Sequence, residues 1–308
     1  MPDSNQHMQC MEIWGGNQPF DNSVVMSGLD AWVYSKPYND SEGGGDVYYV
    51  SACATGRIAR LLLADVSGHG NVVAQTARGL RRLMQRYVNF IDQTAFVREM
   101  NRQFAEMSGA GVFATAVVST FFAPTNELTL CIAGHPLPMI YRAKEKHWSL
   151  WNEGDSGNIP LGIDDISEWS QVSARLSVGD LVLCYTDSLI ESRGPDGEFL
   201  GTAGLLKIVQ GLDISDEKQI IPNLLKAVGA QAEGNLAADD VTVLLFRPNG
   251  SATAAPFLSR AFAPIRVLGA AIQSLVSDTP APWPEFNWVN LGGAMFKPLS
   301  RLRSRKSG

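Results

Sequence analysis

The sequence has few of the residues that build zinc sites or disulfide frameworks, with only four cysteines and four histidines among 308 residues. The cysteines are far apart and form no C-x-x-C pair; they are Cys10, Cys53, Cys131 and Cys184. Cys131 and Cys184 lie in the apolar runs LTLCIAG and LVLCYTD. Reduced, buried thiols are therefore favoured over a metal or redox site.

Long apolar runs and an excess of positive charge are also missing. No run approaches the ~18–20 apolar residues of a membrane-spanning helix, and the start, MPDSNQHMQC, lacks the basic and apolar regions of a signal peptide. The formal net charge of −6 argues against nucleic acid as a partner. With 45% hydrophobic residues, the composition excludes disorder throughout the chain. A globular, cytoplasmic protein is expected.

Charge is divided unevenly along the chain, and the division predicts a domain boundary. Residues 251–308 hold seven basic and two acidic residues, a net charge of +5, which leaves −11 on residues 1–250. The segment RPNGSATAAP at 247–256 is typical of a linker. We therefore expect an N-terminal extension (1–21), a compact domain (22–248) and a basic tail (249–308).

The tail combines apolar and basic segments, and its role is open. Ile265, Leu268, Ile272 and Leu275 share one helical face, although Pro264 interrupts any longer helix. The tail is expected to be partly disordered, with apolar patches that fold back on the domain or on a second copy in a dimer. The alternatives are weak contact with an anionic membrane surface and contact with a protein partner.

Within the compact domain, short β-branched runs are mixed with helical periodicity. The runs predicted as strands are 24–35, 46–53, 57–66, 111–122, 127–134, 138–143, 147–151, 169–176, 180–186 and 240–247. Helices are predicted at 71–90, 93–108 and about 202–230, the last split near 211–216. So many strands exclude a fold of βαβ units. The element order favours an α+β fold in which two antiparallel sheets pack together with helices outside.

Acidic residues recur where predicted strands end or where glycines lie beside them. They are Asp46, Asp65, Asp187 and either Asp239 or Asp240. Burying a lone carboxylate costs several kcal/mol unless a cation or hydrogen bonds compensate. If these side chains converge they need a metal, and oxygen-only ligands favour Mg²⁺ or Mn²⁺. The alternative is that each aspartate caps a helix or forms a turn.

Eight segments occur in a characteristic order: GGGDVYYV, LLLADVSGHG, FATAVVSTF, CIAGHPLPMI, IPLGI, VGDLVLCYTDSLIES, DGEFLGTAGL and ADDVTVLLF. In this order they resemble the bacterial metal-dependent serine/threonine phosphatases of the PPM type, which are similar to protein phosphatase type 2C. The segments cover most of residues 40–246, and the resemblance is closest to the sporulation stage II and stress-sigma-regulator branch. The resemblance implies an α-β-β-α sandwich with two Mg²⁺ or Mn²⁺ ions in the cleft between the sheets.

The resemblance also implies roles for single residues. Those at the positions of metal ligands are Asp46, Asp65, Val66, Asp187, Asp239 and Asp240. Asp65 would bridge both ions, Asp46 would bind one directly or through water, and Val66 would bind through its backbone carbonyl. Asp187 and Asp239 would complete the two coordination shells, with Asp240 as the neighbour that orients Asp239.

Such a centre implies hydrolysis without a covalent enzyme intermediate. A water between two divalent ions has its pKa lowered toward neutrality, so Asp65 and Asp46 would be catalytic through that water. The expected substrate is a phosphoserine or phosphothreonine on a regulatory protein, and by resemblance an anti-sigma-factor antagonist in partner switching. A catalytically silent scaffold with the same fold and a hydrolase of small phosphate esters are the alternatives.

Three further residues near these motifs are weighed separately. His69 follows Asp65 by four positions, instead of the two that separate the acid candidate in eukaryotic relatives, so a structural role at a helix start is favoured over proton donation. His135 in the AGHP segment is expected in a structural turn. Ser188 stands where the family usually has glycine, which puts metal affinity in question.

Regulation is expected at the first two predicted helices, 71–108. Arg78, Arg81, Arg82 and Arg86 form a basic stripe that is either solvated or docks an acidic partner. In the related regulators, helices near the site act as a switch, so an activator would contact this region.

Overall fold

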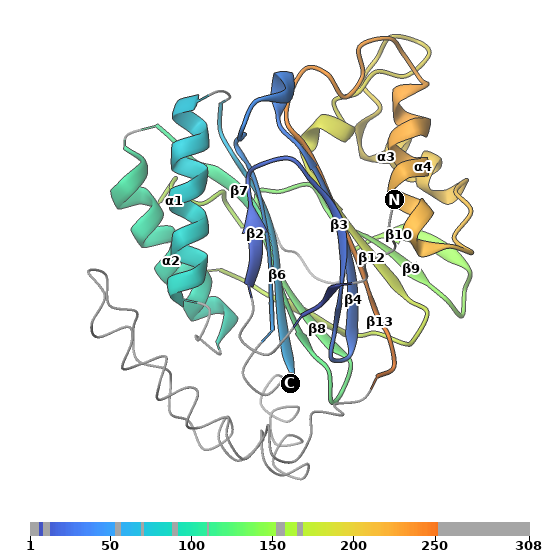
Figure 1. Cartoon of the computed structure of the whole chain (residues 1–308), viewed down its shortest axis with the longest axis horizontal. Coiled ribbons are helices and arrows are strands. Elements are labelled where there is room, and N and C mark those ends of the chain that lie inside the picture. The colour runs from blue at the N-terminus through green and yellow to red at the C-terminus, as the bar shows by residue number, and fades with distance from the viewer. Residues whose placement is uncertain are drawn as a thin grey trace.

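The computed structural model describes residues 6–8, 13–52, 57–68, 71–87, 92–109, 111–151, 158–164 and 169–251. In these residues two β-sheets pack face to face, and a pair of helices covers the outer face of each sheet (Figure 1). The predicted α+β sandwich, with the layer order helix, sheet, sheet, helix, is therefore confirmed.

The six-stranded sheet has the strand order β11-β8-β7-β6-β5-β2, and all neighbouring strands are antiparallel. Its strands are β2 (Ile13–Gly16), β5 (Asp46–Ala52), β6 (Ile58–Val66), β7 (Ala114–Phe122), β8 (Glu127–Ala133) and β11 (Val172–Arg175). The neighbouring strands β5 and β6 carry Asp46 and Asp65, so this sheet positions the first two predicted metal ligands.

The seven-stranded sheet has the strand order β1-β3-β4-β13-β12-β9-β10. Its strands are β1 (Gln6–His7), β3 (Phe20–Met26), β4 (Leu29–Lys36), β9 (Met139–Arg142), β10 (His147–Leu150), β12 (Leu181–Tyr185) and β13 (Val241–Pro248). Among the described strands, β1 and β3 form the one parallel pair. Asp187 follows β12 and Asp240 precedes β13, so this sheet positions the other predicted ligands.

The N-terminal residues contribute more to the sheets than the sequence indicates. β1, β2 and the first two residues of β3 come before residue 22, where the sequence places the start of the compact domain. The single strand predicted over 24–35 is wrong: β3 and β4 form a hairpin whose turn contains Gly28, with a φ of +84°. Glycine adopts positive φ without steric strain, and the turn allows the reversal.

The helices follow the predicted periodicity closely. They are α1 (Asn71–Tyr87), α2 (Gln93–Ser108), α3 (Gly201–Gln210) and α4 (Glu217–Gly229), with short 3₁₀ turns η1 (Tyr38–Asp40) and η2 (Asp187–Leu189). The Asp92 carboxylate caps α2 by accepting the Ala95 N–H at 2.9 Å. The helices α1 and α2 cover the six-stranded sheet, whereas α3 and α4 cover the seven-stranded sheet (Figure 1).

The central strands bury both of their faces, which explains their continuous apolar sequences. In β6, Leu61 and Leu63 point into the core between the sheets. Leu62 and Ala64 point the other way, into the core beneath α1 and α2. β12 and β13 alternate likewise between the inter-sheet core and a third core beneath α3 and α4. Polar residues at the ends of these strands are thereby held on a rigid frame.

The cysteine prediction holds for the two thiols that the structure describes. Cys131 and Cys184 are free and buried, and burial raises the pKa of each thiol to about 12. Cys10, Cys53 and residues 252–308 lie outside the described residues. In the part of the chain that is described, no helix has the length and apolar character needed to cross a membrane.

Candidate metal centre

The predicted carboxylates meet at one end of the sandwich. Asp46 and Asp65 lie directly opposite each other on β5 and β6. Asp187 lies just after the end of β12, and Asp240 lies just before the start of β13. These two strands are antiparallel neighbours, so both residues are at the same end of the sheet. Thr186 joins the two sheets here, because its hydroxyl donates to Oδ2 of Asp46 at 2.9 Å. Carboxylates from four separate chain segments therefore face a common region.

Burial and mutual repulsion raise the pKa values of these carboxyl groups. Burial, followed by repulsion from Asp187, raises the pKa of Asp65 to about 7. Burial, followed by repulsion from Glu191, raises the pKa of Asp187 to about 6. Asp46 is only 3% exposed, and burial together with repulsion from Asp65 lifts its pKa well above the usual range. Cations beside the cluster would therefore favour its fully ionised form.

Asp240 differs from the other aspartates because backbone groups occupy its carboxylate. Its Oδ1 accepts the Tyr38 N–H at 2.6 Å, and its Oδ2 accepts the Gly45 N–H at 2.5 Å and the Asp46 N–H at 3.4 Å. The side chain thus anchors the loop before β5. Asp239 is half-buried, and its Oδ1 accepts the Asp240 N–H at 2.8 Å.

The glycines before β5 allow this anchoring. A Cβ on Gly44 would overlap the Asp240 carboxylate. A Cβ on Gly45 would lie 2.8 Å from the Val66 carbonyl oxygen, which is closer than real Cβ contacts come. The Val66 N–H donates to the Gly45 carbonyl at 3.2 Å. The loop backbone therefore packs directly against both Asp240 and the predicted carbonyl ligand.

Two residues at this end were not singled out by sequence reasoning. Glu191 lies close enough to Asp65 and Asp187 to raise both pKa values by repulsion. Glu191 follows Asp187 by four positions, and this spacing is the sequence signal that could have identified it as a neighbour of Asp187. Asn17 is buried and donates to the Gly44 carbonyl at 2.8 Å and to the Ala74 carbonyl at 3.1 Å. No sequence pattern indicates that its amide joins the loop to α1.

Three further residues were weighed separately in the sequence, and the structure describes two of them, His135 and Ser188. His135 is 5% exposed, and Thr115, which lies opposite Asp65, is 2.8 Å from its Nδ1. Burial lowers the pKa of His135 to about 3, so the imidazole is neutral. Ser188 is buried, and its hydroxyl lies 3.5 Å from that of Thr186. His69 lies outside the described residues.

The donor set suits hard divalent cations, although it does not form a closed shell. Within the described residues, no group of three or more His, Cys, Asp or Glu side chains is already arranged around a single metal position. The carboxylates are nevertheless close enough to shift one another's pKa values. Oxygen donors with excess negative charge fit Mg²⁺ or Mn²⁺ better than softer metals.

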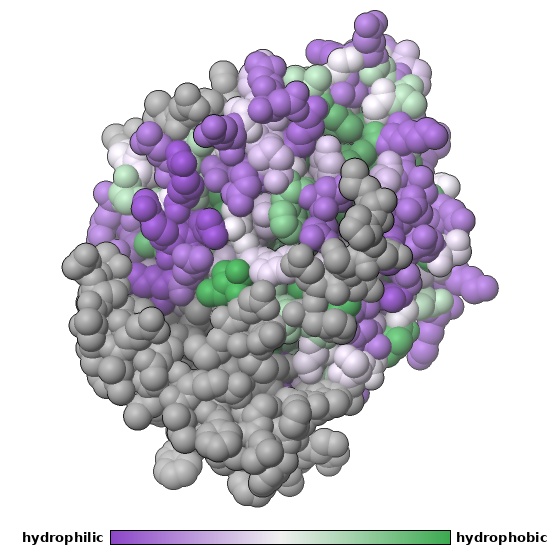
Figure 2. All heavy atoms as spheres, viewed as in Figure 1, coloured by the Kyte–Doolittle hydropathy of each residue, from purple (hydrophilic) through white to green (hydrophobic). Residues whose placement is uncertain are grey.

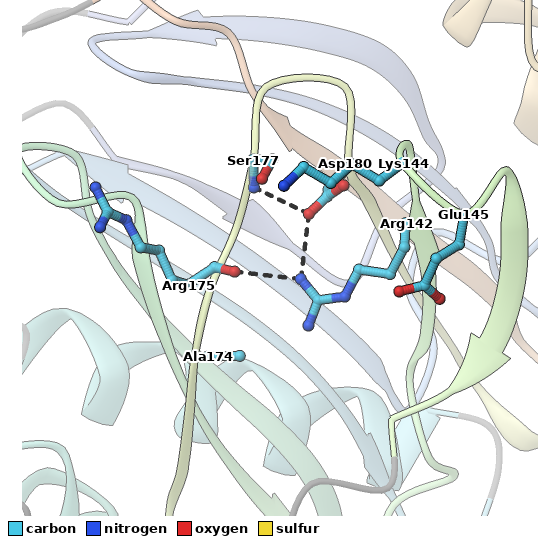
Figure 3. A pocket seen from close by; sticks show the side chains of 7 residues that line it. All are labelled: Arg142, Lys144, Glu145, Ala174, Arg175, Ser177 and Asp180. Atoms are coloured by element: carbon cyan, nitrogen blue, oxygen red, sulfur yellow. Dashed lines mark hydrogen bonds and ion pairs between the residues drawn. The ribbon is translucent and has the colours of Figure 1, made fainter.

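A pocket of about 410 Å³ lies at the other end of β12 and is a poor alternative site (Figure 3). Arg142 donates from one nitrogen to Asp180 at 3.1 Å and to the Arg175 carbonyl at 3.2 Å. Asp180 also accepts the backbone N–H groups of Ala143 and Ser177, each at 2.9 Å. These bonds join the turn after β9 to the segment before β12. The charged residues Arg142 and Asp180 that line the pocket therefore have structural partners.

The four arginines of the predicted basic stripe lie on α1, but two of them, Arg81 and Arg86, are half-buried. Figure 2 shows a hydrophilic surface over α1, where Arg78 and Arg82 are exposed. Arg86 is half-buried, with its guanidinium 5.5 Å from the centre of the Tyr87 ring. α1 packs on β5 and β6, the two strands that carry Asp46 and Asp65.

The sandwich shares the fold of PP2C-type phosphatase domains. It superposes with a TM-score of 0.60 on the PP2C phosphatase domain and regulatory-domain fragment of the cell fate determinant SpoIIE from Bacillus subtilis, at 17% identity, covering 78% of this chain and 64% of that one. RsbX in complex with magnesium gives a TM-score of 0.55 at 14% identity, covering 74% of this chain and 100% of that one.

Sequence comparison places the chain in a family. Residues 55–249, more than half of the chain, match the family described as Stage II sporulation protein E (SpoIIE), and the chain belongs to this family. The phosphoserine phosphatase RsbU of Bacillus subtilis (strain 168) is 22% identical over 188 residues, which are 61% of this chain. The chain spans 55% of the length of RsbU.

Proposed function

We propose that this chain is a phosphoprotein phosphatase that depends on divalent cations and acts on phosphoserine or phosphothreonine of a regulatory protein. The observation that carries the proposal is the cluster of Asp46, Asp65 and Asp187, whose burial and repulsion raise their pKa values until cations compensate. RsbU is named a phosphoserine phosphatase, and RsbX is seen with magnesium, which supports the same chemistry here.

The proposal gives each residue at this end a role. Two Mn²⁺ or Mg²⁺ ions would be held by Asp46, Asp65, Val66, Asp187 and Asp239. When bound, such ions supply positive charge for the phosphoryl oxygens and acidify a water molecule to near neutral pH. Asp240 is assigned to the loop backbone instead, because three N–H groups already occupy its oxygens.

The protein residues keep the site ready for an in-line displacement. β5 and β6 hold Asp46 and Asp65 opposite each other in the strand register, so the backbone already brings these two residues to the same strand end. Positioning and electrostatic stabilisation supply most of the rate in phosphoryl transfer, and the positive charge of the ions held by these carboxylates would supply that stabilisation here. Asp46, the first residue of β5, is 3% exposed, so little bulk water reaches its side chain.

The proposed substrate is a cytoplasmic phosphorylated regulator, of the type of an anti-sigma-factor antagonist. The proposed activator binds α1 and α2. Asn17 gives that surface a route to the site, because its amide bonds both Ala74 of α1 and Gly44 of the loop anchored by Asp240. Catalysis is assigned to residues 13–248, and the basic tail to localisation or partner contact.

The test is turnover of a phosphoserine protein and of p-nitrophenyl phosphate by the full chain, with Mn²⁺, Mg²⁺ or EDTA. Metal-dependent activity is expected, with kcat/KM higher for the phosphoprotein. Asp65→Ala is expected to lose more than ~100-fold. The control is Asp180→Asn, which alters a buried carboxylate at the opposite end of β12 and is expected to keep the activity per folded molecule.

The other outcomes identify the alternatives. Equal or higher kcat/KM for the small ester would indicate a hydrolase of small phosphate esters. Absence of turnover with either metal and with the phosphoprotein, in protein whose fold is verified by circular dichroism, would indicate a binding scaffold.

A further inference from the structure

A cluster of buried hydroxyl groups lies beside Asp46. Its members come from β4, the end of β12, η2 and β13, and are Ser35, Thr186, Ser188 and Thr242. The hydroxyls of Ser35 and Thr242 are 3.0 Å apart, and those of Thr186 and Ser188 are 3.5 Å apart. Buried hydroxyls need partners, and the two threonines of this cluster hydrogen-bond Asp46.

Thr186 connects this cluster to Asp46. Its hydroxyl proton has two nearby oxygen acceptors outside the cluster's own hydroxyls. Its Oγ1 accepts the Thr242 N–H at 3.0 Å. It lies 2.9 Å from Oδ2 of Asp46 and 3.3 Å from the Thr242 carbonyl. A hydroxyl has a single proton to donate. The Asp46 carboxylate is the nearer of the two acceptors, so the proton goes to Asp46.

This bond links the two sheets at the metal centre. Asp46 belongs to the six-stranded sheet, whereas Thr186 follows the last residue of β12 in the seven-stranded sheet. The next residue is Asp187, whose backbone position is fixed by the same turn. Thr186 therefore ties the side chain of one predicted ligand to the main chain beside another.

We propose that Thr186 is a positioning residue that orients the Asp46 carboxylate and sets its spacing from Asp187, so that both bind the same pair of divalent cations. This inference rests on the proposed function. The side chains of Thr186 and Thr242 both hydrogen-bond the Asp46 carboxylate, and the Thr186 hydroxyl lies 2.9 Å from Oδ2. Asp46 lies opposite Asp65, so these bonds hold its carboxylate at the strand end where the ions would bind. Hydrogen bonds that orient metal ligands typically contribute 10–100-fold to metal affinity.

The substitutions that test this separate the hydroxyl from the shape of the side chain. Thr186→Val has nearly the same volume and removes the hydroxyl, whereas Thr186→Ser retains it. The matched control is Thr120→Val. Thr120 is also buried, and its hydroxyl accepts from Nε of Arg60 at 3.3 Å. It lies five residues along β7 from the partner of Asp65, or about 17 Å away.

The experiment measures Mn²⁺ binding to the full chain by titration calorimetry, and kcat and KM on p-nitrophenyl phosphate. Thr186→Val is expected to weaken Mn²⁺ binding by ~10–100-fold and to lower kcat, with KM at saturating Mn²⁺ changed less than twofold. Thr186→Ser is expected to restore both values to within about threefold of wild type. Thr120→Val is expected to match wild type in Mn²⁺ binding, even if its thermal stability falls.

Each remaining outcome has a defined meaning. Equal Mn²⁺ affinity in Thr186→Val and Thr120→Val overturns the inference while leaving the proposed function standing. Wild type that neither binds Mn²⁺ nor turns over substrate overturns the proposed function itself, and the inference with it. If Thr186→Val does not fold, Thr186→Cys takes its place, because a thiol is a weaker donor of similar size. Wild-type Mn²⁺ affinity in that variant would also overturn the inference.

Discussion

Two adjacent aspartates at the start of β13 have different surroundings, and these decide what each carboxylate can do. Asp240 is 4% exposed, and backbone N–H groups saturate its oxygens. Asp239 is half-buried, and its negative charge raises the pKa of Asp65 more than that of Asp240 does. A carboxylate that already accepts strong hydrogen bonds gains less from a cation than one that faces other carboxylates. We therefore propose Asp239, rather than Asp240, as the metal ligand of the pair.

Asp65 gives a pH-dependent prediction for metal-free protein. Burial and the surrounding carboxylates raise its pKa from an ordinary 3.8 to about 7 in the folded protein. The folded state thus holds a proton that the unfolded chain has released. The stability this provides is complete below the unfolded pKa and is lost as pH rises through about 7. Asp65→Asn cannot lose a proton, so in EDTA it should gain stability relative to wild type by on the order of 3 kcal/mol between pH 5 and pH 8.

Urea unfolding of both proteins at several pH values measures this difference. A constant difference between Asp65→Asn and wild type across that range would contradict the raised pKa. Adding Mn²⁺ at pH 8 should abolish the advantage of the variant, because the cation offsets the repulsion in wild type.

At the scale of elements, the loop before β5 couples backbone geometry to the proposed metal centre. Gly44 has no positive φ, so its requirement for glycine is steric rather than conformational. The place where its Cβ would stand is filled by the Asp240 carboxylate. Moving that carboxylate would release the N–H groups of Tyr38 and Gly45 and shift Asp46, which begins the next strand.

Gly44→Ala is therefore expected to destabilise the protein by ~1–3 kcal/mol and to weaken Mn²⁺ binding. Gly229→Ala, in the last turn of α4, is the matched control, since a Cβ there meets nothing within 4 Å. This control should leave Mn²⁺ affinity unchanged and alter stability by less than ~1 kcal/mol. Thermal unfolding and calorimetry of both variants provide the comparison, and equal behaviour of the two would show that the loop does not position the site.

Comparison of the predicted with the observed elements shows which of them the sequence can predict. The buried strands and the helices were predicted because their apolar periodicity is strong, as in β6 and α1. β2 escaped prediction because it is short and ends in Gly15 and Gly16, which carry no pattern. Thr186 and Asp46 are 140 residues apart, so their bond depends on how the two sheets pack. The carboxylates themselves could be found because each lies at a strand end.

At the scale of the whole molecule, the layered packing creates a concentration of negative charge that no single element contains. One pair of carboxylates comes from each sheet, and the inter-sheet core holds them at a fixed separation. Their repulsion opposes the folded state, and a cation that binds only the folded protein relieves it. Metal binding should thus be visible as global stabilisation, independently of any substrate.

The expected result is a rise in Tm when Mn²⁺ is added to protein freed of metal with EDTA. At a free concentration 100-fold above Kd the stabilisation is about 2.7 kcal/mol. For a domain of this size that corresponds to roughly 5–10 °C. Asp187→Asn removes one carboxylate at the end of β12, so its Tm should rise by less than half as much at the same Mn²⁺ concentration. Differential scanning calorimetry measures both shifts. An equal rise in wild type and variant would place the bound ion away from Asp187, because an ion held by that carboxylate cannot stabilise the variant to the same extent.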